Sequence, residues 1–161
     1  MKHLSFILLF ASPLFISAQT PEEQSVDFIQ QLKMNQSDTV YVINFWATWC
    51  KPCIEELPAF QKLDSLYRDK KVKVILFSLD SKKQVNEKLL PFLKKHHIRC
   101  TVYITDVVTF NKRIDEVSPD WSGAIPATLI SGKTKAGKLF FEKPFTFDEL
   151  EKIVQPLITK Q

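Results

Sequence analysis

Two almost wholly apolar runs constrain the fold of this chain more than any other feature. Residues 40–45 (VYVINF) and 72–79 (VKVILFSL) are rich in β-branched and aromatic side chains. Strands that are buried on both faces have this composition, and they occur in parallel sheets covered by helices. Between the two runs, residues 51–67 carry apolar side chains at helical spacing. The pattern predicts a strand–helix–strand unit with a right-handed crossover.

The rest of the chain continues the alternation of helices and strands. A capping box over residues 20–23 predicts the start of a helix that runs to residue 33, and a second capping box begins the last helix at residue 146. Between them the patterns predict helices over residues 82–96 and 107–117, a strand over 100–105, and a hairpin of strands 128–131 and 138–142. The expected fold is α/β, with one central mixed sheet flanked by helices, in a single domain over residues 19–161.

The first eighteen residues have the layout of a secretory signal peptide. A basic start precedes an apolar run over residues 4–16, and the small residues Ser17 and Ala18 precede a polar segment. The run is shorter than the ~20 residues that span a bilayer. We therefore expect cleavage after Ala18 and export of residues 19–161 as a soluble periplasmic protein, with an uncleaved membrane anchor as the alternative.

Charge and composition exclude several classes of function. The chain has 22 Lys and Arg against 18 Asp and Glu, a net charge of +4. This excess is too small and too scattered to indicate a nucleic-acid partner. Lysines crowd at residues 82–83, 94–95 and 133–138, where solvated helix faces or loops are expected. Three glycines in the whole chain exclude the Gly-rich loops that bind phosphates.

The candidate chemistry lies in residues 49–53 (WCKPC), where the first strand meets the helix that follows it. Cys50 would begin this helix, where free N–H groups and the positive end of the helix dipole stabilise a thiolate and lower its pKa. Lys51 would add positive charge, and Pro52 would occupy a first turn that does not need its missing N–H. Cys53, one turn further, would be more buried and would resolve a mixed disulfide formed by Cys50.

The same cysteines are compatible with three other uses. A purely structural disulfide would close a loop so short that it stabilises little. A copper or zinc carrier would use Cys50 and Cys53 with His96 or His97, but the histidines lack ligand-like spacing, and no metal is predicted. The third alternative is an interaction module whose disulfide is never turned over. The remaining cysteine, Cys100, lies on the apolar face of its strand and is expected to be a buried, inert thiol.

Residues 42–53 (VINFWATWCKPC) resemble the active-site segment of the thioredoxin superfamily. With residues 54–58 (IEELP) they complete a W-C-x-P-C-x-x-E-x-P pattern that is similar to exported TlpA/ResA-type thiol-disulfide reductases, and residues 121–128 (WSGAIPAT) resemble the cis-proline loop of that family. The resemblance implies a thioredoxin-like fold with an N-terminal helix and a central helix–strand insertion before Cys100. It also implies a redox-active Cys50–Cys53 disulfide and no bound cofactor.

The resemblance further implies partners and contact residues. It favours a reductase whose substrates are disulfides in other exported proteins, cytochrome apoproteins among them. A membrane-embedded thiol donor would re-reduce the protein. Trp49, Ile125 and Pro126 are the candidates for contact with the substrate chain, with a cis bond expected before Pro126. Trp46 and Trp49 are expected to pack around the disulfide.

The acid that serves the buried cysteine is expected on the helix. Thioredoxin itself has a buried acid on the strand that leads into the motif, and Asn44 stands at that position here. An amide can only hydrogen-bond, whereas the TlpA/ResA group resembles this chain in having an acid at Glu56. Glu56 follows Cys53 by three residues, so the two side chains share a helix face. Burial would raise its pKa and suit it to carry the proton of Cys53; the alternative is a surface glutamate paired with a lysine.

Overall fold

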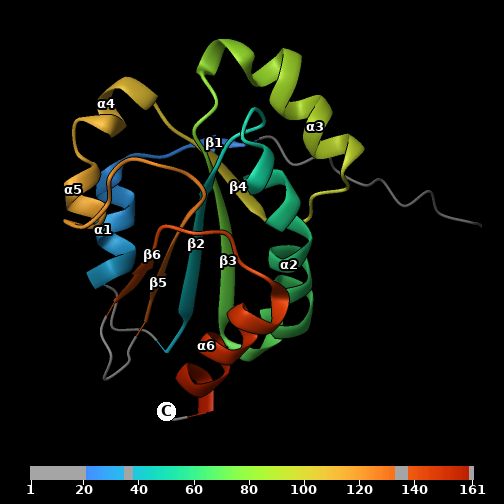
Figure 1. The fold of residues 1–161 in the computed structure, drawn as a ribbon, viewed down its shortest axis with the longest axis vertical. Helices are drawn as coiled ribbons and strands as arrows, with labels where there is room; N and C mark the ends of the chain where they lie inside the picture. The colour runs from blue at the N-terminus through green and yellow to red at the C-terminus, as the bar shows by residue number, and fades with distance from the viewer. Residues whose placement is uncertain (1–20, 35–37, 133–137, 160–161) are drawn as a thin grey trace, which may run out of the picture.

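The computed structural model describes residues 21–34, 38–132 and 138–159 as a mixed six-stranded sheet with helices on both faces (Figure 1). The strand order is β1-β4-β3-β2-β5-β6. Strands β1, β4, β3 and β2 are parallel, and β5 and β6 form an antiparallel hairpin at the other edge. The strands are β1 (Glu22–Glu23), β2 (Val40–Trp46), β3 (Val72–Ser78), β4 (Thr101–Ile104), β5 (Ala127–Ser131) and β6 (Leu139–Phe141). The predicted signal peptide lies outside the described residues.

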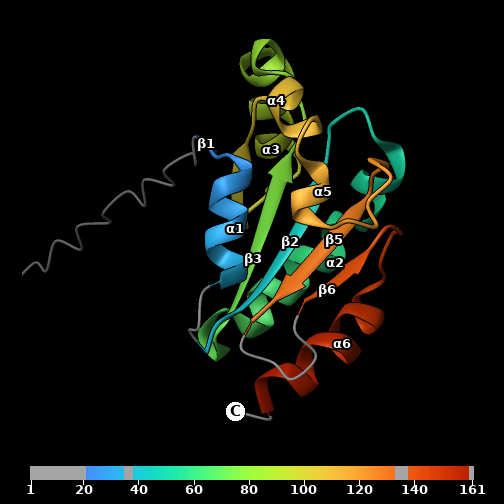
Figure 2. The ribbon, with the colours of Figure 1, turned by 90° about the vertical axis from the view of Figure 1, so that its left-hand side faces the viewer.

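The helices form two layers that cover the two faces of the sheet (Figures 1 and 2). One face carries α1 (Val26–Met34), α4 (Val107–Asn111) and α5 (Ile114–Val117). The other carries α2 (Lys51–Tyr67), α3 (Leu90–Lys95) and α6 (Phe147–Thr159). No helix in the described part of the chain is long and apolar enough to cross a membrane.

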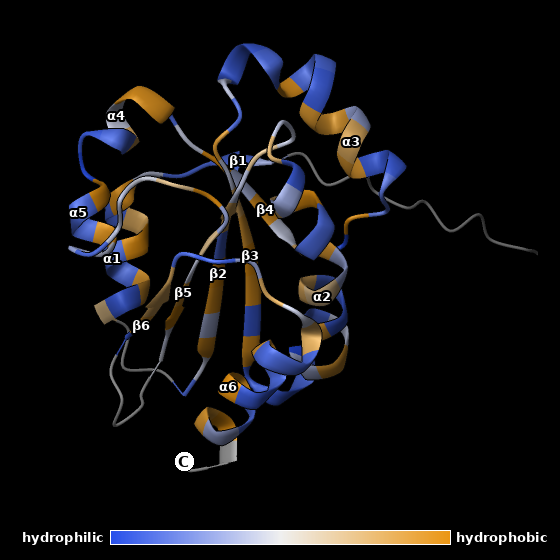
Figure 3. Ribbon diagram, viewed as in Figure 1, coloured by the Kyte–Doolittle hydropathy of each residue, from blue (hydrophilic) through white to orange (hydrophobic). Residues whose placement is uncertain are grey.

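Alternation along the central strands supplies both hydrophobic cores. Val42 of β2 belongs to the cluster under α2 and α6, whereas Ile43 and Phe45 belong to the cluster under α1, α4 and α5. The strands are therefore hydrophobic along most of their length, while the helices mix hydrophilic and hydrophobic residues (Figure 3). The prediction of strands buried on both faces is confirmed, and the predicted helix over residues 51–67 is α2.

The predicted capping box at the N-terminus is wrong. Glu22 and Glu23 form strand β1, which pairs in parallel with β4, and the N–H of Gln24 donates to the carbonyl of Ile104 at 2.8 Å. The helix starts later, at Val26. The physical reason is the outer edge of β4, whose backbone groups would otherwise lack strand partners. A pattern of neighbouring residues cannot show that a distant strand edge is available for pairing.

Two predicted helices are interrupted. The segment after β3 begins with a 3₁₀ turn (Lys82–Gln84) and a π turn (Val85–Leu89) before α3. Pro91 has no N–H to donate and its ring crowds the carbonyl four residues earlier, which disfavours regular α-helix there. The predicted helix over residues 107–117 is divided into α4 and α5. The hairpin and the capping box at residue 146 are confirmed.

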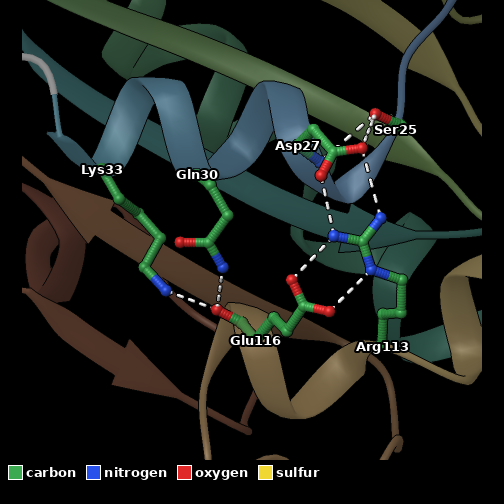
Figure 4. Close-up of polar contacts among 6 residues, drawn as sticks. All are labelled: Ser25, Asp27, Gln30, Lys33, Arg113 and Glu116. Atoms are coloured by element: carbon green, nitrogen blue, oxygen red, sulfur yellow. Dashed lines mark hydrogen bonds and ion pairs between the residues drawn. The ribbon is translucent and has the colours of Figure 1, made fainter.

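The N-terminal helix is held to α5 by a polar network on its outer side (Figure 4). The guanidinium of Arg113 pairs with Asp27 of α1 at 2.7 Å and with Glu116 of α5 at 2.6 Å. These bonds lower the pKa values of both carboxyl groups. Gln30 and Lys33 donate to the backbone carbonyl of Glu116, which closes the network.

We expect helix α1 to contribute to the free energy of unfolding. Ile29 is fully buried against the sheet, so Ile29→Ala should lower the free energy of unfolding by about 2–5 kcal/mol. Gln31→Ala, on the exposed side of the same helix, should change it by less than about 0.5 kcal/mol. Urea denaturation measures both. Equal effects of the two substitutions would show that α1 contributes nothing to the core.

Candidate active site

The two cysteines of the motif form a disulfide at the start of α2. Cys50 is the N-cap residue, with an extended backbone, and its Sγ accepts the N–H of Cys53 at 3.3 Å. The two Cα atoms are 5.3 Å apart, and Cys53 is fully buried while 6% of Cys50 is exposed. Pro52 lies in the first turn of the helix. In the reduced protein the same N–H group and helix end would stabilise a thiolate on Cys50.

The proline loop lies opposite the disulfide. The Ile125–Pro126 peptide bond is cis, as predicted, and the carbonyl oxygen of Ile125 lies 3.8 Å from Sγ of Cys50. The indole N–H of Trp121 donates to the carbonyl of Ala124 at 2.8 Å, and Gly123 has a φ of +94°, which few other residues adopt. These contacts shape the loop that presents Ile125 to the disulfide.

A carboxylate that sequence reasoning missed also fixes this loop. Glu142, directly after β6, accepts the N–H of Ser122 at 3.0 Å and the hydroxyl of the same serine. These bonds lower the pKa of Glu142. No sequence pattern indicates the contact, because twenty residues separate the two side chains.

The two tryptophans of the motif have different environments. Trp46 is fully buried, its ring lies 5.4 Å from that of Phe92, and it belongs to the same apolar cluster as Cys50 and Cys53. Trp49 is 64% exposed, so the expectation that it packs around the disulfide is wrong. It lies in the loop after β2 ends, where side chains no longer point into the sheet layers. Lys51 is also exposed and pairs with Glu55 at 3.8 Å, on the solvent side of α2.

Glu56 is buried beneath the motif and joins three segments. Its Oε1 accepts the side-chain N–H of Asn44 on β2 at 2.7 Å, and its Oε2 accepts the N–H of Phe145, before α6, at 2.7 Å. The alternative of a surface glutamate paired with a lysine is therefore wrong, since only 4% of Glu56 is exposed. Burial raises the pKa of Glu56 to about 7, and the two hydrogen bonds oppose that rise. The Oδ1 atom of Asn44 is buried and accepts no hydrogen bond from any residue that the structure describes.

A second buried carboxylate holds the loop that leads into the motif. Asp80 follows β3 and accepts the N–H of Thr48 at 3.0 Å and its hydroxyl at 2.6 Å. Ser78 also donates to Asp80, at 2.8 Å. Sequence reasoning did not single out Asp80. The available signal was its position after a buried strand, because carboxyl ends of neighbouring parallel strands meet at one edge of the sheet.

The third cysteine lies apart from this arrangement. Cys100 is 1% exposed, and burial raises the pKa of its thiol to about 12, with the nearby Asp64 adding to the rise. The ring of His96 stacks on Phe92, with centroids 4.1 Å apart. Among the residues that the structure describes, no three His, Cys, Asp or Glu side chains gather as a metal site would require.

The fold and the site define the class of protein: a thioredoxin fold with a C-x-x-C disulfide at a helix start, facing a cis-proline loop. Within that class, the chain belongs to the AhpC/TSA family, which matches residues 16–136.

Relatives and solved structures agree with this placement. The thiol-disulfide oxidoreductase ResA of Oceanobacillus iheyensis is 34% identical over 80 residues, which are 50% of this chain and 41% of that protein. The alignment thus spans less than half of that relative. A thioredoxin-family thiol:disulfide interchange protein from Chlorobium tepidum superposes with a TM-score of 0.62 at 19% identity, covering 86% of this chain and 96% of that one. StoA from Bacillus subtilis superposes with a TM-score of 0.55 at 22% identity, covering 75% and 85%.

The three cysteines of the reduced protein should react in a fixed order. Cys50 should be alkylated first near neutral pH, because the helix start favours its thiolate, and Cys53 should follow. Cys100 should remain unmodified until the protein unfolds, because it is buried and its pKa is raised. Mass spectrometry of iodoacetamide-treated protein after timed quenching measures the order. Faster labelling of Cys53 than of Cys50 would reverse their assigned roles.

Proposed function

We propose that this chain is an exported thiol-disulfide oxidoreductase that reduces disulfides in other exported proteins. The observation that carries the proposal is the Cys50–Cys53 disulfide at the start of α2, with the backbone of Ile125 3.8 Å from Sγ of Cys50. Two thiols carry the electron pair, so the reaction needs no bound cofactor. The signal-peptide pattern of the first eighteen residues supports export.

The reaction proceeds by two thiol–disulfide exchanges. The Cys50 thiolate attacks one sulfur of a substrate disulfide, which forms a mixed disulfide and releases the other substrate sulfur as a thiolate that takes up a proton. The Cys53 thiolate then attacks Sγ of Cys50 and releases the second substrate thiol. The substrate gains two electrons and two protons, and Cys50–Cys53 becomes a disulfide. A membrane-embedded thiol donor returns the pair to the dithiol state.

The substrate chain binds at the proline loop. An extended segment on either side of the substrate cysteine can pair with the backbone of Ile125, as in strand addition. Pro126 holds this part of the loop opposite Cys50, and the exposed ring of Trp49 offers an apolar contact beside it. The role of the two carboxylates Asp80 and Glu142 is to position the two loops rather than to touch substrate.

Glu56 takes the proton from Cys53 during the second exchange. Its raised pKa, about 7, brings it near the pH at which the reaction runs. Asn44 can hydrogen-bond to Glu56 in either protonation state of the glutamate. Its side-chain N–H donates to the carboxylate. After a flip of the amide, Oδ1, which has no partner among the described residues, can accept a hydrogen bond from the protonated carboxyl group.

The activity is tested with reduced protein and insulin as the disulfide probe. The parent protein should reduce insulin, and Cys50→Ser should not. Cys53→Ser should accumulate mixed disulfides through Cys50, because the second exchange is missing. Non-reducing electrophoresis of Cys53→Ser expressed with its signal sequence identifies the captured proteins. A parent protein that reduces no disulfide, with a variant that captures nothing, would reject the reductase and leave the alternatives in which the disulfide is never turned over.

The proton role of Glu56 is tested by Glu56→Gln. This variant should slow the second exchange about tenfold to a hundredfold and leave the attack by Cys50 nearly unchanged. Because folding raises the pKa of Glu56 from 4.5 to about 7, the folded protein binds the proton more tightly. The stability from that proton is fully present below about pH 4.5 and is lost as the pH rises through 7. Glu56→Gln should remove this slope in urea denaturation.

The matched control is Glu55→Gln, on the exposed side of the same helix. It should retain both the rate of the second exchange and the pH slope. If Glu56→Gln behaves like the parent protein in single-turnover kinetics across pH 5–9, Glu56 does not carry the proton.

A further inference from the structure

The positive charge of this chain is concentrated in one stretch. Residues 82–99, here called the basic segment, contain six lysine or arginine residues and one glutamate, a net charge of +5. The whole chain has a net charge of +4, so all its other residues together are slightly negative. The basic segment comprises the two turns after β3, α3, and the residues that lead to β4.

These charges are exposed and mostly unneutralised. All six basic side chains are exposed, whereas Leu89 and Leu93 face the core. Lys82 pairs with Glu23 at 2.7 Å. The other five basic residues of the segment make no ion pair with any residue that the structure describes; they are Lys83, Lys88, Lys94, Lys95 and Arg99. Hydrophilic residues recur along this stretch of the ribbon, with hydrophobic ones between them (Figure 3).

The basic segment packs directly on the active-site region. The ring of Phe92 lies 5.4 Å from that of Trp46, four residues before Cys50. Leu89 and Leu93 belong to the same apolar cluster as Cys53. Figure 1 shows the segment beside the start of α2, at the end of the sheet where β2 leads into the helix. A partner that binds these charges would therefore lie against the segment that packs beside the start of α2.

We propose that the basic segment is a docking surface for protein substrates with an acidic stretch near their disulfide. The proposal rests on the proposed function, because it names the substrates of the same site. Unpaired lysines beside a reactive cysteine raise the local concentration of an oppositely charged partner and speed its encounter. The exposed Trp49 then makes an apolar contact with the substrate, and the basic segment favours substrates that carry acidic residues.

A membrane surface fits the segment less well. Helices that lie in a membrane interface bury exposed apolar side chains in the lipid and surround them with basic ones. The large exposed apolar residues of the described chain are Met34, Trp49, Leu66 and Val108, and none lies in the basic segment. The segment therefore offers charge without an apolar face, which matches an acidic polypeptide.

The test uses three synthetic peptides of equal length, each with one internal disulfide, flanked by glutamate, glutamine or lysine. Quenched-flow measurement gives the rate at which the reduced protein attacks each disulfide. At low salt the acidic peptide should react about tenfold faster than the neutral one, and the basic peptide should react more slowly. The difference should largely disappear at about 0.5 M salt, where the Debye length falls below ~5 Å.

The variant with Lys88, Lys94 and Lys95 changed to Gln should lose most of the preference for the acidic peptide. The control variant changes Lys70, Lys73 and Lys152 to Gln, which removes the same charge from exposed positions outside the basic segment. The control should keep the preference. Equal losses in the two variants would overturn the proposal, because net charge alone would then explain the selection.

Binding separates this proposal from the proposed function. The oxidised protein should bind a cysteine-free acidic peptide in a salt-dependent way, and the Lys88/Lys94/Lys95 variant should not. Binding without reduction of any disulfide would support the docking surface and reject the reductase. Reduction of all three peptides at equal rates would support the reductase and reject the docking surface. Tighter binding to phosphatidylglycerol vesicles than to the acidic peptide would overturn the choice of an acidic polypeptide as the partner.

Discussion

The structure depends on the buried carboxylate of Glu56. A carboxylate removed from water requires hydrogen-bond donors, and here one comes from the side chain of Asn44 on β2 and the other from the backbone of Phe145 before α6. The three segments are far apart in the sequence, and the carboxylate joins them one helical turn after Cys53. The same burial that makes Glu56 costly to ionise gives it a pKa of about 7. The burial of Glu56 thus underlies both its structural contacts and the proton transfer that we propose for it.

Two other carboxylates, Asp80 and Glu142, hold the loops on either side of the disulfide. Asp80 binds the loop before Cys50 through Thr48, and Glu142 binds the proline loop through Ser122. In the proposed reaction, one loop carries the attacking sulfur and the other carries the backbone that binds the substrate chain. Loops of this kind would otherwise sample many conformations, at an entropic cost to each productive encounter. Side-chain hydrogen bonds from outside the loops reduce that freedom.

The charged residues of this chain lie in three different environments. Several surface carboxylates accept hydrogen bonds from nearby cations or N–H groups, and the pKa of Glu149, beside Lys143, is lowered to about 2. Glu56 is buried and is shifted the opposite way. The basic segment lies beside the start of α2 (Figure 1), and within the described residues only its Lys82 has an ion-pair partner, Glu23. Unpaired surface charge adds little to stability, so its concentration beside a reactive cysteine is better explained by recognition.

The sequence by itself determined the central strands, the bounds of α2, and the position of the cysteine pair at a helix start, because each depends on local periodicity and on residues adjacent in the chain. Helical spacing also placed Glu56 on the face of Cys53. Tertiary structure alone decided that residues 22–23 pair with β4, that Trp49 points to solvent, and that Asp80 and Glu142 hold the two loops. These features depend on which distant backbone edge or N–H group lies within hydrogen-bonding distance, and only the folded chain brings those partners together.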